Sequence, residues 1–151
     1  MPRISCWFVR ASLVHLGTGA LFGGLILSAK GFPPLLSWAW LLLTAHIQVM
    51  VGGWLVQLAL GMAYWLLPRL DAHGDRGRPA WVWTSFAALN GGVGSAALLL
   101  LVRVWWRTPW LDALLVAAAL AQMGALVVFA RHAWPRIALV TSGIKRNSST
   151  A

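Results

Sequence analysis

The 151-residue sequence is poor in charged residues, in acidic residues above all, and in cysteine. Only 10% of its residues are charged and three are acidic, whereas 60% are hydrophobic and the mean hydropathy is +0.74. Soluble globular domains have about 45–50% apolar and about 25% charged residues, so the composition excludes an ordinary soluble domain and indicates a lipid bilayer as the solvent. The single cysteine, Cys6, excludes an internal disulfide and any multi-cysteine metal or iron–sulfur site.

The net charge of +9 does not indicate a nucleic-acid-binding protein. The 12 Lys and Arg residues lie between apolar runs, which is typical of membrane topology signals and not of a surface that binds phosphates. We therefore expect the lipid bilayer as a partner and no nucleic acid.

Four apolar stretches are long enough to cross a bilayer, which requires about 20 residues in a helix. Prolines and glycines punctuate the breaks between them. The sequence predicts an all-α integral membrane protein, an antiparallel four-transmembrane-helix bundle. It forms one domain over residues 1–140, and a polar C-terminal tail follows over residues 141–151. The predicted spans cover about 8–29, 35–67, 81–104 and 110–130.

Basic residues fall unevenly on the two sides of the predicted bundle. Three lie on one side, namely Lys30, Arg103 and Arg107, and nine lie on the other. Because cytoplasmic loops are enriched in Lys and Arg, both termini and the 68–79 loop are predicted to be cytoplasmic. We expect a multi-pass protein of the bacterial inner (cytoplasmic) membrane. The nine basic residues are Arg3, Arg10, Arg69, Arg76, Arg78, Arg131, Arg136, Lys145 and Arg146.

Two histidines at membrane depth lie on helix faces that carry glycines. Polar groups inside a span are costly and usually face another helix, a cavity or a cofactor. In the first span, His15, Gly19 and Gly23 recur every four residues and share a face. The third span adds Asn90. The second span adds a face formed by His46, Met50, Gly53, Gln57, Gly61 and Tyr64.

These faces have two interpretations. Glycines let a flat macrocycle or another helix approach the backbone closely. Imidazole is a common axial ligand of haem iron, so His46 and His15 are candidate metal ligands of a haem b. Counting along each helix from the outer loop puts them about 5 Å apart in depth. Alternatively, the glycines pack helices together and each histidine hydrogen-bonds a neighbouring helix. His73 and His132 are expected to be solvated.

The second span also carries the motif H-x-x-x-x-x-x-G-W, followed by G-x-x-Y-W-x-x-P-R. The motif resembles helix II of the haem-copper oxidase subunit I superfamily, and it is most similar to the small cbb-type-oxidase-like membrane proteins. In that superfamily the helix II histidine is an axial ligand of the low-spin haem near the outer side of the membrane, so the resemblance implies this role for His46. The third-span Asn90-Gly91-Gly92 and the later Trp134-Pro135-Arg136 are similar to the same small proteins.

The sequence also departs from this superfamily. An oxidase subunit has many more spans, and its later helices supply the second low-spin ligand and the histidines that bind copper and the high-spin haem. This chain has no such helices, and its one acidic residue in a predicted span, Asp112, lies at the outer end of a helix, so we expect neither oxygen reduction nor proton pumping by this chain alone.

Two functions are consistent with these features. The first is electron transfer or small-gas (NO or O2) binding by a b-type haem protein, as a homo-oligomer or with other membrane subunits of a larger respiratory complex. The second is a haem-free structural or accessory subunit of a multi-subunit membrane complex.

Reporter fusions test the predicted topology. A fusion at Lys30 should report the periplasmic side and one at Asp75 the cytoplasmic side, because the basic residues concentrate around the second position. Alkaline phosphatase and green fluorescent protein activity at the two sites measure this. The same side reported at both positions would show the topology to be wrong.

Overall fold

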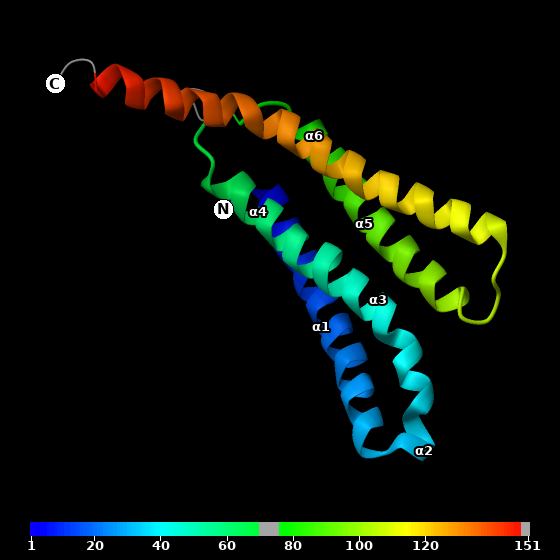
Figure 1. The fold of residues 1–151 in the computed structure, drawn as a ribbon. Helices are drawn as coiled ribbons and strands as arrows, with labels where there is room; N and C mark the ends of the chain where they lie inside the picture. The colour runs from blue at the N-terminus through cyan, green and yellow to red at the C-terminus, as the bar shows by residue number, and fades with distance from the viewer. Residues whose placement is uncertain (70–75, 149–151) are drawn as a thin grey trace.

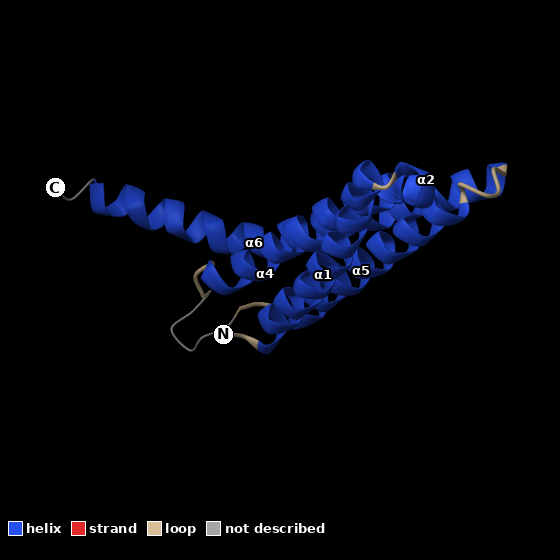
Figure 2. Ribbon diagram, turned by 90° about the horizontal axis from the view of Figure 1, so that it is seen from below, coloured by secondary structure: helices blue, strands red, loops and turns tan. Residues whose placement is uncertain are grey.

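The computed structural model describes residues 1–69 and 76–148 of the chain. These residues form helices and the turns that connect them, and no strand occurs among them. The all-α class predicted from the sequence is therefore confirmed (Figures 1 and 2). The elements are α1 (Arg3–Gly31), α2 (Pro33–Leu36), η1 (Ser37–Leu42), α3 (Leu43–Gln48), η2 (Val49–Val56), α4 (Gln57–Leu66), α5 (Pro79–Val102) and α6 (Pro109–Ser148).

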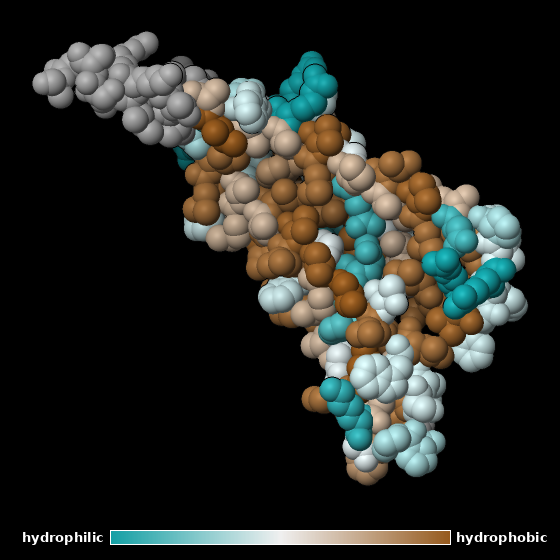
Figure 3. Space-filling view, viewed as in Figure 1, coloured by the Kyte–Doolittle hydropathy of each residue, from teal (hydrophilic) through white to brown (hydrophobic). Residues whose placement is uncertain are grey.

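Four helical segments within the described residues are long and apolar enough to cross a membrane. They cover Arg3–Gly31, Ser37–Leu66, Pro79–Val102 and Pro109–Ala138. Large apolar side chains cover much of their outer surface, as the brown regions of Figure 3 show. A surface of this kind is stable only against lipid, so the chain is a multi-pass membrane protein whose helices contact the bilayer.

The second span is built from helical segments of different geometry. A 3₁₀ segment, η1, precedes α3, and the π-helical segment η2 separates α3 from α4. The π segment contains Gly52 and Gly53, and glycine resists the regular α-helix by about 1 kcal/mol relative to alanine. π turns inside α-helices are rare and frequently mark functional positions, and here the turn packs against α1.

The last helix extends well beyond the span predicted over 110–130. Arg131 and His132 interrupt the apolar run, but a helix needs no apolar residues to continue, and α6 runs on to Ser148. Pro135 lies inside α6 without ending it, as occurs in membrane helices when neighbouring groups satisfy the freed backbone. Part of the predicted tail, residues 141–148, is therefore helical and projects beyond the other helices (Figures 1 and 2).

The helices pack in a simple order. The first span packs on the second, α5 packs on the second span and on α6, and the two pairs separate toward one end (Figure 1). At the end near the N-terminus all four spans meet around Phe8, which is fully buried. Its ring centroid lies 5.1 Å from that of Phe86 and 6.5 Å from that of Phe129, both edge to face. This aromatic cluster joins the two pairs.

Glycines bring the first two spans into close contact, in agreement with the helix-packing interpretation of these faces. A Cβ atom on Gly53 would lie 2.5 Å from Cγ of His15, and one on Gly61 would lie 2.7 Å from Cβ of Phe8. Neither neighbouring atom is the end of a flexible chain, so larger residues do not fit without a backbone shift.

This packing predicts opposite effects for two glycine substitutions. Gly53→Ala should destabilise the protein by about 1–3 kcal/mol because its methyl group overlaps the base of the His15 side chain. Gly24→Ala should be neutral or stabilising by about 0.5–1 kcal/mol, because nothing lies within 4 Å of its Cβ position and alanine favours a helix. Unfolding free energies in detergent micelles measure both, and equal effects would contradict the packing.

Candidate functional site

His46 is held by the backbone of the first span. Its Nδ1 lies 2.8 Å from the carbonyl oxygen of Gly19. A carbonyl only accepts hydrogen bonds, so Nδ1 carries a proton and donates it. A Cβ atom on Gly23 would lie 3.0 Å from Cε1 of the same ring. Two glycines one turn apart therefore supply both the acceptor and the space for the imidazole.

The other nitrogen of this imidazole is free to act as a ligand. Nε2 of His46 makes no hydrogen bond within the described residues, and the side chain is only partly buried. When Nδ1 is protonated, Nε2 of a neutral imidazole presents a lone pair. Histidines that bind metals almost always donate their second nitrogen to a carbonyl or carboxylate in this manner, so the residues present fit an axial haem ligand at this position.

His15 is engaged differently, in a polar network that joins three spans. Its ring packs on Gly53, and its Nε2 lies 3.3 Å from Oδ1 of Asn90. The same oxygen accepts a hydrogen bond from Nε2 of Gln57 at 3.2 Å, while Nδ2 of Asn90 donates to the Phe86 carbonyl. This amide orientation makes His15 a donor, so its Nε2 is occupied by the network.

The two histidines contact different levels of the helix interface. His15 packs beside Gly53, whereas His46 precedes that position by seven residues and lies against Gly19 and Gly23. Seven residues correspond to roughly 10 Å along a helix, about twice the separation counted from the sequence.

The remaining predicted site residues are spread along the second span. Met50 lies beside His46, and its thioether fills the space above Gly19. Gly61 packs against Phe8 at the far end of the interface. Tyr64 is buried beyond it, with its ring next to His132 and Arg136. The structure therefore places Gly19, Gly23 and Met50 around His46 and places the other predicted residues elsewhere.

Two polar contacts were not foreseen from the sequence. Nε2 of Gln48 donates to Oε1 of Gln122 at 2.8 Å, which links α3 to α6. His132, expected to be solvated, is partly buried against the Tyr64 ring, and its Nε2 is buried without a hydrogen-bond partner. Gln48 is a polar residue within an apolar run, and this alone could have indicated that it bonds to a neighbouring helix. His73 lies outside the described residues.

No family model matches the chain, and comparisons with characterised proteins and with solved structures also find no match. In the described part of the chain, no group of three or more His, Cys, Asp or Glu side chains could hold a metal ion.

The network around Asn90 predicts a measurable loss of stability. Asn90→Leu should lower the free energy of unfolding by about 1–3 kcal/mol, because the donors of His15 and Gln57 both lose their acceptor. Thr84→Val on the exposed face of the same helix is the control, since its hydroxyl bonds only to Ala80 of its own turn, and it should change stability by less than about 0.5 kcal/mol. An equally small effect at Asn90 would show that the network contributes little.

Proposed function

We propose that the chain is a membrane-embedded subunit that binds haem b through His46 and serves electron transfer or small-gas binding in a larger respiratory complex. The observation that carries the proposal is the 2.8 Å contact from Nδ1 of His46 to the Gly19 carbonyl, which fixes the ring and leaves Nε2 for a metal. The likeness of the second span to helix II of the haem-copper oxidase superfamily supports the same residue.

The orientation proposed for the chain follows from its basic residues. Consecutive spans run antiparallel across a bacterial inner membrane, and the arginine-rich end lies in the cytoplasm. His46 then lies in the outer half of the bilayer, because α3 follows the loop that begins at Lys30. A haem at this depth would exchange electrons with a donor on the outer side or with a neighbouring subunit.

The second axial ligand is proposed to come from outside this chain. His15 already donates Nε2 to Asn90 and lies about two turns from His46 along the interface. Using it would require both the loss of this hydrogen bond and a shift of α1. His46 of a second copy, or a residue of another membrane subunit, needs neither.

The chain itself would supply three things to the bound group. His46 would bind the iron, Gly19 and Gly23 would fix the imidazole plane, and the apolar outer half of the span would exclude water. Haem supplies the one-electron and gas-binding chemistry. The acidic residue of the described spans, Asp112, lies in the first turn of α6 and pairs with Arg103, so the described spans place no carboxylate in the middle of the bilayer to relay a proton.

A haem-free structural subunit is the second candidate, and a specific observation favours it. The glycines that could admit a macrocycle are filled by the protein's own side chains, since Met50 covers Gly19, His15 covers Gly53 and Phe8 covers Gly61. In this case His46 and His15 are both interhelical hydrogen-bonding groups, and the helix II pattern is a packing surface.

Visible spectra of the purified protein separate the two candidates. The wild-type protein, produced with ample haem and its native partners, should show a Soret band and reduced-minus-oxidised α peaks. His46→Ala should abolish both, because the axial ligand is lost. His15→Gln, which removes the imidazole and keeps a side-chain donor for Asn90, is the matched control, and it should leave the iron low-spin and six-coordinate.

Two results would change this conclusion. Absence of Soret absorption in the wild-type protein would establish the structural candidate. A five-coordinate spectrum in His15→Gln would show that the sixth ligand is internal, in contrast to the proposal.

A further inference from the structure

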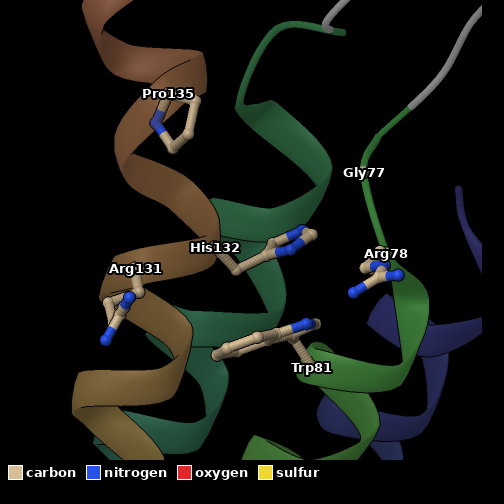
Figure 4. A pocket seen from close by; sticks show the side chains of 6 residues that line it. All are labelled: Gly77, Arg78, Trp81, Arg131, His132 and Pro135. Atoms are coloured by element: carbon tan, nitrogen blue, oxygen red, sulfur yellow. The ribbon is translucent and has the colours of Figure 1, made fainter.

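A hollow at the arginine-rich end of the bundle lies apart from His46. It has a volume of about 290 Å³ and is formed by the start of α5 and the later part of α6. Figure 4 shows His132 reaching from α6 toward Arg78, with Trp81 beneath it and Arg131 on the α6 side. Arginine and histidine side chains line this hollow, whereas an empty packing defect would be lined by apolar side chains.

The positive charge here has no carboxylate partner within the described residues. The chain has three acidic residues, of which Asp71 and Asp75 lie outside the described part. The third, Asp112, pairs with Arg103 at 2.9 Å at the opposite end of the bundle. Arg78 and Arg131 therefore line a hollow that favours an anion.

Buried polar nitrogens beside the hollow also lack hydrogen-bond partners. Nε2 of His132, which lines the hollow, is buried without a hydrogen-bond partner. One turn further on, Arg136 is fully buried, with Nε and Nη2 bonded to carbonyls of residues 64–68 and with Nη1 unpartnered. Unpaired buried polar groups are costly and rare in native proteins. An anion in the hollow would accept a hydrogen bond from Nε2 of His132 in the tautomer that carries the proton there.

An apolar hollow continues from the basic one along α6. It has a volume of about 380 Å³ and is lined by Val127, Ala130 and Trp134, and it shares Arg131 and Pro135 with the first. A charged hollow joined to an apolar one matches an amphiphile, with its phosphate among the arginines and an acyl chain on the helix face. A free phosphate would use only the first hollow.

We propose that this joined pair of hollows binds an anionic phospholipid, with its phosphate against Arg78, Arg131 and His132 and one acyl chain along residues 127–134 of α6. Trp81 and Trp134 mark the level of the membrane interface, so a bilayer lipid reaches the site laterally. Basic hollows between membrane helices bind the head groups of anionic lipids through such contacts.

Lipid titrations of the full chain test the proposal. The protein in detergent micelles is titrated with dioleoyl phosphatidylglycerol, dioleoyl phosphatidylcholine or inorganic phosphate, and Tm and native mass spectra are recorded. Phosphatidylglycerol should raise Tm and remain bound in the mass spectra, whereas the other two should do neither. An equal response to inorganic phosphate would show a free-anion site, and an equal response to phosphatidylcholine would show nonspecific lipid binding; either contradicts the proposal.

Two variants locate the site. Arg78→Gln with Arg131→Gln should weaken phosphatidylglycerol binding roughly 10-fold or more. The control variant, Arg3→Gln with Arg10→Gln, removes two positive charges from the same end of the bundle. Neither residue lines the hollow, so this variant should still bind phosphatidylglycerol. Ala130→Trp, which fills the apolar hollow and keeps every arginine, should also weaken it. Unchanged binding in Ala130→Trp, or equal losses in the two double variants, would overturn the proposal.

Discussion

A polar side chain inside a bilayer must find its hydrogen-bond partner on another helix, and Asn90 meets this need for three spans at once. Its Oδ1 accepts from His15 of α1 and from Gln57 of α4. Intramembrane hydrogen bonds of this kind contribute only about 0.6 kcal/mol on average, but they allow few alternative registers. The network therefore fixes the axial register of α1 relative to the second span. The glycine contacts along that interface depend on this register.

The position of His46 follows from the same register. With His15 seated on Gly53, the glycines of the outer half of α1 come level with α3, and the Gly19 carbonyl meets Nδ1 of His46. The two histidines thus have different roles. One fixes the helices relative to each other, and the other is oriented by that arrangement with a free nitrogen. The π-helical turn lies between them, where the second span adjusts its pitch to satisfy both contacts.

Much of this arrangement was predictable from residue spacing. The four spans, the shared face of the second span and the glycine contacts with the first all follow from helical periodicity. The sequence could not show what occupies the space beside the glycines of the first two spans, because a side chain of the facing helix and a macrocycle would both fit there. It also did not show that the last helix continues past residue 130, where Arg136 is buried by carbonyl groups of residues far away in the chain. The bond between Gln48 and Gln122 was missed because spacing within one helix does not identify a partner on another.

Imidazole rescue tests the role of His46 most directly. His46→Gly removes the ligand and leaves a space that free imidazole can enter, next to the Gly19 carbonyl that would orient it. The account predicts that this variant lacks Soret absorption and that added imidazole, supplied with haem, restores the wild-type low-spin spectrum. A wild-type spectrum in His46→Gly without imidazole would contradict the account, because the iron would then have its ligands elsewhere.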